Sequence, residues 1–319
     1  MKNYRTKTRQ IIKCIVKPVY YLPYNIRLLI KGRRQEMILP EADVIRDLLG
    51  DVNRNIIGVA STGKRIAEVK KSISELGVDK YFVQWLSVDE IQKDKTDNNL
   101  YIFFELFEYA NMAKYLHEIG LKDGKDFILF VNGKKYRERY RETSRQRKWF
   151  EVENVRKINK QDWINRILLM KDLIGTENKS VLDIGCWECE LKEYLDNSMK
   201  YYGCDYVKRQ NDTIVCDLNH YEFPNIDFDV AYISGSLEYM ENLEWYFDQI
   251  CKANHEVVLS YSLLEYFPLI DLRKKKSWVN HLSVIDIIEY MKRRNFLLTT
   301  SEFWGRWTVI FKFERENVV

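Results

Sequence analysis

Apolar and polar positions along residues 51–133 predict strands that alternate with helices. A helical stripe places Ile66, Val69, Ile73 and Leu76 on one face, and a second helix is expected over 106–118. Four short apolar runs suit buried strands, at 55–60, 80–86, 99–104 and 126–131. Strands joined by helices form βαβ units and therefore a parallel sheet. We expect a small Rossmann-like domain over 51–133.

A second alternating series begins at residue 160. An amphipathic helix with Trp163, Ile167 and Met170 on one stripe precedes the next strands, which are expected at 180–184, 200–204, 213–216, 228–233 and 255–260. Ser283 and Asp286 have the spacing of a capping box, which predicts the start of a late helix. "FLLTTSEFW" and "RWTVIFKFE" follow on either side of Gly305 and predict an antiparallel closing pair.

Charge divides the chain further. Residues 134–159 are densely charged and carry no strand pattern, which predicts a helical linker. Residues 1–50 form a separate N-terminal arm, and 1–34 contain ten Lys/Arg but no Asp/Glu. The other 285 residues therefore have a net charge of −6, although the whole chain is at +4. Because basicity is confined to the arm, a nucleic-acid partner is not expected.

The arm has no segment that could span a bilayer, because Lys13, Lys17 and Arg27 interrupt its apolar stretch and Pro18 and Pro23 break it. It also lacks the pattern of a signal peptide, so we expect a cytoplasmic protein whose six cysteines stay reduced. Two interpretations of residues 1–34 stay open. They pack on the body or a partner, or they hold the protein peripherally at an anionic inner membrane face.

Ligand-binding residue types recur where strands of the second series end. Asp183 and Gly185 close the first strand and open a turn, where free backbone N–H groups can face a ligand. Asp205 ends the next strand, placed to accept the hydroxyls of a ribose, and Asp217 ends the third. The fourth strand ends in the small residues 234–236, which leave room for a substrate. Open α/β sheets bind ligands at this edge.

These four segments, "VLDIGC", "YYGCDYV", "IVCDLNH" and "FDVAYISGSLEYM", resemble the first four motifs of class I S-adenosylmethionine-dependent methyltransferases. The resemblance covers residues 160–319 and implies a seven-stranded, doubly wound sheet with an antiparallel closing pair. It also implies S-adenosylmethionine as cofactor. Its methionine part would contact Asp183 and Gly185, its ribose Asp205, and its adenine Asp217 and Leu218. The full implied cofactor-binding set is Asp183, Gly185, Cys186, Trp187, Asp205, Tyr206, Asp217, Leu218 and Ser234.

The chain departs from the family at Trp187 and Cys189, where glycines are usual. Glycine lets the backbone approach a ligand closely, which a tryptophan does less well. Trp187 therefore either lines the cofactor pocket or closes it, and the sequence leaves both open.

The cysteines offer a competing interpretation. Cys186 and Cys189 form a C-x-x-C, and Cys204 and Cys216 follow within 31 residues. A four-thiolate zinc site needs tetrahedral convergence, which adjacent strands of one sheet rarely supply. We expect no metal and treat the cysteines as small apolar fillers.

The first series contains "GVASTGKR" (58–65), which fits the opening of a phosphate-binding P-loop but has Arg65 where Ser or Thr would hold magnesium. Residues 53–132 resemble the small nucleotide-binding-like domains attached to bacterial surface-polysaccharide enzymes, through "LGVDKYFVQWLSVDEI" and "IGLKDGKDFILF". Because the dinucleotide glycines are mostly absent, this domain is expected to serve as a docking module.

A hydroxyl acceptor usually requires a general base. His281 is the first candidate, because it lies in the loop where this fold builds its acceptor site, and His220 is the second. Glu238 is an alternative that would orient an acceptor or cap a helix.

We expect O-methylation of a sugar or glycan intermediate, nucleotide- or lipid-linked, in cell-surface polysaccharide biosynthesis. That acceptor rests on the resemblance of the first domain. The alternatives are methylation of a protein or other small molecule, and a non-catalytic scaffold that keeps a degenerate methyltransferase fold. Association into a homo-oligomer stays open.

Overall fold

A computed structural model describes residues 37–91, 98–106, 109–133, 135, 160–175, 178–268, 270–305 and 307–316. Residues 37–319 form one compact unit. The basic residues 1–34 lie outside the described residues, as does the segment 134–159 apart from Lys135. Membrane contact through the arm and a helical linker therefore stay predictions. Among the helices of the described ranges, none has the length and apolar character needed to cross a bilayer.

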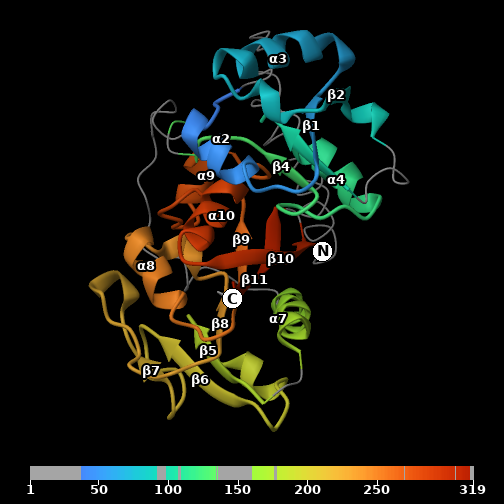
Figure 1. Ribbon diagram of the computed structural model, residues 1–319. Coiled ribbons are helices and arrows are strands. Elements are labelled where there is room, and N and C mark those ends of the chain that lie inside the picture. The colour runs from blue at the N-terminus through green and yellow to red at the C-terminus, as the bar shows by residue number, and fades with distance from the viewer. Residues whose placement is uncertain are drawn as a thin grey trace, which may run out of the picture. The chain divides into compact units, whose positions relative to one another are not determined.

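The first sheet is parallel and four-stranded, in the order β2-β1-β3-β4 (Figure 1). Its strands are β1 (Asn55–Ala60), β2 (Gln84–Ser87), β3 (Asn99–Phe103) and β4 (Phe127–Leu129), and its helices are α2 (Ala42–Leu49), α3 (Ile66–Glu75) and α4 (Tyr109–Glu118). The predicted βαβ alternation is confirmed. The second strand begins later than predicted, because Asp79–Tyr81 form a 3-10 turn in front of it.

The second sheet has seven strands, in the order β10-β11-β9-β8-β5-β6-β7 (Figure 1). They are β5 (Ser180–Ile184), β6 (Lys200–Asp205), β7 (Ile214–Val215), β8 (Val230–Ser234), β9 (Glu256–Ser262), β10 (Phe296–Trp304) and β11 (Thr308–Arg315). β11 alone runs antiparallel to the others, between β9 and β10. This order, with its antiparallel closing pair, matches the methyltransferase fold that the resemblance implies.

The helices of this half are α7 (Lys160–Ile174), α8 (Leu243–Ile250), α9 (Ile270–Lys274) and α10 (Val284–Lys292). The predicted capping box is confirmed at α10, where Ser283 Oγ accepts from the backbone N–H of Asp286 and the Asp286 carboxylate accepts from that of Ser283. Two orphan donors of the first turn are thereby satisfied. All seven residues of β9 are buried, as expected for a strand inside a covered sheet.

The P-loop-like turn after β1 is filled by the chain's own carboxylate. Glu105, only 1% exposed, accepts from the backbone N–H of Ser61 at 2.5 Å and from Arg65 Nε at 2.7 Å. A phosphate bound to a P-loop would use such backbone donors. Arg65 stands where a P-loop has its magnesium ligand, and its hydrogen bond holds the Glu105 carboxylate where a phosphate would bind. The turn is therefore filled by a side chain of the same chain.

Buried polar contacts join the two sheets around Tyr266. Its hydroxyl donates to the buried carboxylate of Asp123, which precedes β4, and lies 3.0 Å from His117 Nε2 on α4. Burial lowers the pKa of His117 to about 4, so the ring is neutral at pH 7. Ser301 on β10 also donates to the Asp123 backbone carbonyl. The first sheet is therefore attached to the second by specific hydrogen bonds as well as by apolar packing.

Removing the Tyr266 hydroxyl is expected to weaken this joint. The Tyr266→Phe variant deprives the buried Asp123 carboxylate of one donor, which should lower the free energy of unfolding by about 1.5–3 kcal/mol. Urea titration followed by circular dichroism measures the change. Tyr81→Phe, at a half-buried turn before β2, is the matched control and should change little. Equal unfolding midpoints for the two variants would contradict the role given to Tyr266.

Candidate cofactor and acceptor site

The carboxyl ends of β5, β6, β7, β8 and β9 surround a cavity of about 810 Å³. The turns that follow these strands line it, and helix α7 and the β10–β11 turn complete its wall. The strand order reverses between β5 and β8, the topological switch point at which doubly wound sheets bind ligands. The position of the cavity therefore follows from the topology of the sheet.

The turn after β5 keeps a glycine-type backbone path. Gly185 has φ +77°, and a Cβ built on it would lie 2.6 Å from Ser236 Cβ, so no other residue fits there. Trp187 and Cys189 also have positive φ, at 51° and 60°. Non-glycine residues rarely adopt this conformation, which costs on the order of 1 kcal/mol or more. The backbone of this turn thus has the left-handed conformation that favours glycine, although Trp187 and Cys189 carry side chains.

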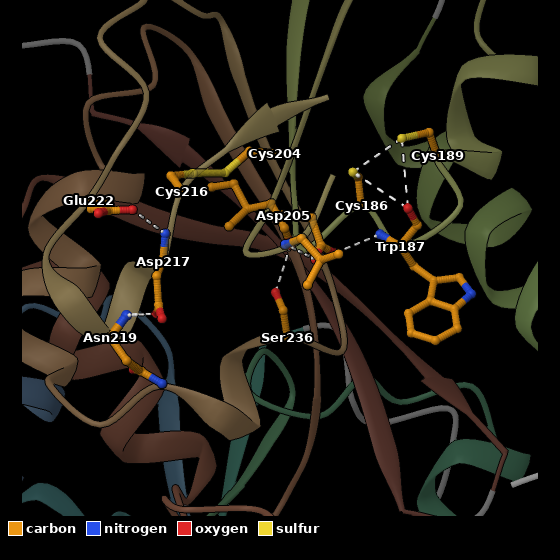
Figure 2. The surroundings of a disulfide bond; sticks show 12 residues. Cys186, Trp187, Cys189, Cys204, Asp205, Cys216, Asp217, Asn219, Glu222 and Ser236 are labelled. Carbon is orange, nitrogen blue, oxygen red and sulfur yellow. Dashed lines mark hydrogen bonds between the residues drawn. A yellow bond between two sulfur atoms is a disulfide. The ribbon is translucent and has the colours of Figure 1, made fainter. Parts of the chain in front are cut away.

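Trp187 lines the cavity instead of filling it. Its indole ring stacks on that of Trp163 of α7, with the ring centroids 5.9 Å apart. The Arg209 guanidinium lies 4.2 Å from the centroid of the Trp187 ring. Figure 2 shows Asp205 between Trp187 and Asp217. Of the two possibilities that the sequence left open for this side chain, the geometry favours a wall of an open pocket.

Asp205, the last residue of β6, is buried and lines the cavity. Its Oδ2 accepts from the backbone N–H of Trp187 at 3.1 Å, and its Oδ1 accepts from that of Val207 at the same distance. These bonds, together with an ion pair between Oδ1 and Arg209 Nε at 3.6 Å, fix the carboxylate at the cavity wall. The neighbouring Tyr206 also lines the cavity.

Asp217 begins the turn after β7 and also lines the cavity, as do Leu218 and His220. The Asp217 carboxylate accepts from the backbone N–H of Asn219 at 3.0 Å and lies 2.7 Å from His220 Nδ1. The exposed His220 side chain is thereby held at the rim, and its hydrogen bond to Asp217 raises its pKa. The fold therefore brings His220 to the cavity, but its Nδ1 is hydrogen-bonded to Asp217, the residue that the resemblance places beside the adenine.

The expectation that all six cysteines stay reduced is not met, because a disulfide joins Cys204 and Cys216 (Figure 2). Cys204 pairs with Ile214 in the register of β6 and β7, which places Cys216 two residues further on, on the same face of the sheet. The resulting Cα–Cα distance of 6.6 Å lies within the usual range for a disulfide. The bond ties together the two strand ends that carry Asp205 and Asp217.

Cys186 and Cys189 lie on the other face of β6, where both sulfurs approach Gly203. Their Sγ atoms are 3.2 Å apart, and both side chains are buried. Burial raises the pKa of the Cys186 thiol, which keeps it protonated and poorly reactive. The four cysteines form two separate pairs, and the part of the chain that the structure describes holds no cluster able to ligate a metal. Cys186, predicted to touch the cofactor, is not a lining residue.

Asp183 lies beneath the cavity, outside its lining. The side chain is 4% exposed and accepts from the Tyr201 hydroxyl at 2.9 Å. Burial raises the pKa of Asp183 to about 7, and the Tyr201 hydrogen bond opposes that rise. The resemblance placed this residue at the methionine part of the cofactor, whereas the structure makes it a support under the β5 turn.

Arg166 on α7 is a lining residue that the sequence analysis did not identify. One guanidinium nitrogen donates to the Ser234 backbone carbonyl at 3.2 Å, and the group packs against the rings of Trp163 and Trp304. Its Nε is buried and has no hydrogen-bond partner in the structure. The sequence offered one sign of this role: Arg166 lies three residues after Trp163, on a helical stripe that is otherwise apolar. A single cation at such a position is equally typical of a surface residue.

The far wall of the cavity comes from the segments after β9 and between β10 and β11. It carries three indole rings, from Trp278, Trp304 and Trp307, and the Lys276 ammonium lies 5.5–5.6 Å from the centroids of Trp278 and Trp307. Ser262 and Thr308, with hydroxyls 3.2 Å apart, lie at its base. This wall is aromatic with hydrogen-bonding groups between the rings.

The structure does not bring His281 to the cavity. Its side chain is 1% exposed, and its Nδ1 accepts a hydrogen bond from Arg273 Nε at 3.0 Å. The ring nitrogen that could take a proton is therefore already used by a buried cation. The loop lies where the sequence suggested, but the side chain points into the protein, and this geometry gives no support to His281 as a base.

No protein-family model and no curated protein matches this chain. The pyocyanin biosynthetic protein PhzM is similar in fold over 47% of this chain and 54% of its own length, at 12% identity and a TM-score of 0.39. The match therefore spans about half of that protein.

Two further solved structures are similar in fold. Magnesium protoporphyrin IX methyltransferase from Synechocystis PCC 6803, with bound S-adenosylhomocysteine, matches over 57% of this chain and 94% of its own, at 15% identity and a TM-score of 0.40. An S-adenosylmethionine-dependent methyltransferase from Mesorhizobium loti matches over 48% and 98%, at 17% identity and a TM-score of 0.40. These likenesses concern the fold alone, and what the chain binds has to follow from its own cavity.

The buried Asp183 predicts a specific dependence of stability on pH. Its folded pKa of about 7 lies above the reference value of 3.8, so the folded state binds the proton more tightly than the unfolded state. This contribution to stability is fully present below about pH 4. It is lost as pH rises to about 7, at up to about 1.4 kcal/mol per pH unit.

The Asp183→Asn variant removes this titration. Relative to wild type, it should therefore gain free energy of unfolding as pH rises from about 4 to about 7, as measured by denaturant titration at several pH values. Asp227→Asn, at an exposed position, is the control. A constant difference between Asp183→Asn and wild type across this range would contradict the shifted pKa.

Proposed function

We propose that this chain is an S-adenosylmethionine-dependent methyltransferase. The observation that carries the proposal is the convergence of Gly185, Asp205, Asp217 and Arg166 on one cavity at the switch point of the sheet. These residues offer a close backbone approach, two carboxylates and a cation. A nucleoside linked to an amino acid requires partners of these types, because it presents ribose hydroxyls, an adenine edge and a carboxylate.

Two buried polar atoms fit the amino-acid end of this cofactor. Arg166 Nε and Ser234 Oγ lack hydrogen-bond partners in the structure, and both residues line the cavity beside Gly235. Buried polar groups without partners are costly, and a ligand carboxylate would satisfy both. We assign Arg166 and Ser234 to that carboxylate, Asp205 to the ribose, and Asp217 with Leu218 to the adenine. When bound, S-adenosylmethionine supplies an electrophilic methyl group on a sulfonium.

The acceptor that we propose is a hydroxyl of a sugar or glycan intermediate. The far wall supports this choice, because its indole rings and the hydroxyls of Ser262 and Thr308 place apolar and hydrogen-bonding surface side by side, as the two faces of a sugar ring require. A role in cell-surface polysaccharide biosynthesis rests on the resemblance noted for the first domain. The proposed contact of the basic N-terminal arm with an anionic membrane rests on the composition of residues 1–34. Docking of a partner enzyme by that domain belongs to the same proposal.

The second candidate is a non-catalytic scaffold that keeps the fold. The observation in its favour is the pair of non-glycine residues in left-handed conformations, Trp187 and Cys189, at the turn that should approach the cofactor. The cavity beside Trp187 argues against it, since a scaffold has no need of an 810 Å³ space lined by unpartnered polar atoms.

Isothermal titration calorimetry with S-adenosylmethionine and with S-adenosylhomocysteine separates the two candidates. We expect both to bind wild type in the micromolar range typical of substrate-sized ligands. Asp205→Asn and Arg166→Met should each weaken binding by about 10–100-fold, because each removes a charged hydrogen-bond partner. The exposed Asp227→Asn is the control. Absence of heat for wild type at millimolar ligand would leave the scaffold as the better account.

The acceptor class is tested separately, by following conversion of S-adenosylmethionine to S-adenosylhomocysteine with nucleotide sugars, sugar phosphates, phenols and amines. Turnover should appear with a sugar, and Trp307→Ala should raise the KM for that sugar more than it lowers kcat, because the ring binds without touching the reacting atoms. Turnover with phenols or amines alone would refute the sugar assignment and leave methyl transfer intact.

A further inference from the structure

Glu238 combines deep burial with a carboxylate oxygen that has no hydrogen-bond partner among the residues that the structure describes. It lies in the 3-10 turn Leu237–Tyr239 directly after β8, and its side chain is 3% exposed. Oε1 accepts from the backbone N–H of Ser262, at the end of β9, at 3.0 Å. Oε2 is buried and has no hydrogen-bond partner in the structure, although the residue lines the cavity. An unpartnered carboxylate oxygen in such a place calls for a ligand group that donates a hydrogen bond.

The bond to Ser262 fixes the direction of this carboxyl group. It holds Glu238 across the carboxyl ends of β8 and β9, between the part of the cavity lined by Gly185 and Ser234 and the indole wall of Trp278 and Trp307. The proposed cofactor occupies the first part and the proposed acceptor the second. Glu238 therefore lines the cavity near the boundary where the proposed methyl donor and hydroxyl would meet.

The surroundings of Glu238 suit a proton acceptor. Burial raises the pKa of its carboxyl group, and Arg166 on α7 and Arg273 on α9 oppose that rise. The buried Tyr246 on α8 and Tyr261 on β9 are close enough for Glu238 to raise the pKa of their phenols. A raised pKa makes the carboxylate a stronger base than that of an exposed glutamate, and the two arginines from different elements limit the rise.

We propose that Glu238 is the general base that removes the proton from the acceptor hydroxyl. This inference rests on the proposed function and goes beyond it by assigning the proton transfer. Oε2 accepts the hydroxyl proton as the acceptor oxygen forms its bond to the methyl carbon, and the carbon–sulfur bond breaks with its electron pair remaining on sulfur. Glu238 is left as a neutral carboxylic acid, which later passes the proton to solvent. No oxidant or further co-reactant is required.

The other candidates are less well placed. His281 is buried outside the cavity lining and is bonded to Arg273, and His220 is held at the rim by Asp217. Asp205 lies at the end of β6, on the nucleoside side of the switch point. Glu238 alone among these residues bridges the ends of β8 and β9.

The acceptor need not be known to test this role, because a ligand can place an N–H donor at the methyl position. Sinefungin is such a ligand, since a C–NH₃⁺ group replaces the S–CH₃ sulfonium of S-adenosylmethionine. If Oε2 faces the methyl position, this ammonium donates to it, and wild type should bind sinefungin at least about tenfold more tightly than S-adenosylhomocysteine. Calorimetry on the full chain gives both dissociation constants.

The variants separate this role from a structural one. Glu238→Gln should remove the preference for sinefungin and keep the affinity for S-adenosylhomocysteine within about threefold, which also shows that the variant folds. Glu238→Asp should restore part of the preference, because it restores the charge. Glu193→Gln, an exposed glutamate outside the cavity lining, is the matched control and should behave as wild type.

The outcomes distinguish the two proposals. Binding of S-adenosylhomocysteine with no preference for sinefungin, or with a preference that survives Glu238→Gln, overturns Glu238 as the base and leaves the proposed function standing. Loss of S-adenosylhomocysteine binding in Glu238→Gln but not in Glu193→Gln would instead make Glu238 a structural residue and also overturn the inference. No binding of either ligand to wild type would refute both proposals.

Discussion

The close approach of two turns determines the geometry of the whole cavity. The turn after β5 and the turn after β8 meet at Gly185 and Ser236, where the Ser236 hydroxyl donates to the Ile184 carbonyl at 2.7 Å. Only a residue without a Cβ fits at this contact, and it sits where the strand order reverses. The walls of the cavity diverge from this point, with Trp187 and Asp205 on one side and Glu238 with the indole rings on the other. Loss of the contact would alter the spacing between these two walls.

Burial of charge accounts for most of the chemistry that we assign. Asp183, Arg166 and Glu238 are all buried. Burial raises the pKa of the two carboxyl groups and lowers the pKa of the guanidinium, so in each case it favours the neutral form. Charges in such surroundings are retained when a partner compensates them, and two of the three lack a full set of partners in the protein. Asp183 has its partner in Tyr201, whereas Arg166 Nε and Glu238 Oε2 have no hydrogen-bond partner among the described residues. This difference is the reason why we propose a structural role for Asp183 and a functional one for Glu238.

In the first sheet, the turn after β1 is filled by a side chain. Glu105 accepts from the backbone N–H of Ser61, a donor of the type that a phosphate would use, and Arg65 holds the carboxylate there. The sheet is instead joined to the second through Tyr266, Asp123 and His117. The turn after β1 of the first sheet is thus filled by a side chain of the same chain, whereas the carboxyl ends of the strands of the second sheet surround an open cavity.

Hydrophobic periodicity predicted the strands and helices of the two series, and local residue types predicted the capping box at Ser283 and the turn of the closing pair at Gly305, because each of these depends on residues close in sequence. The seven-stranded sheet came from the resemblance of four motifs to a known family. The same order of strands placed Asp205 and Asp217 at one edge, since parallel strands all end on the same side. Side-chain direction could not be predicted in this way. His281 lies in the expected loop but turns inward to Arg273, Asp183 lies under the cavity, and Arg166 and Glu238 enter it from segments far apart in sequence.

The cysteines show the same division. Their spacing drew attention to Cys186 and Cys189, whereas pairing of neighbouring strands joined Cys204 to Cys216. The sequence by itself determined the elements, their order and the edge of the sheet at which the cavity lies, because local patterning and topology decide these. Only the tertiary structure decided which side chains face the cavity, because packing and the cost of burying charge are settled between residues distant in the chain.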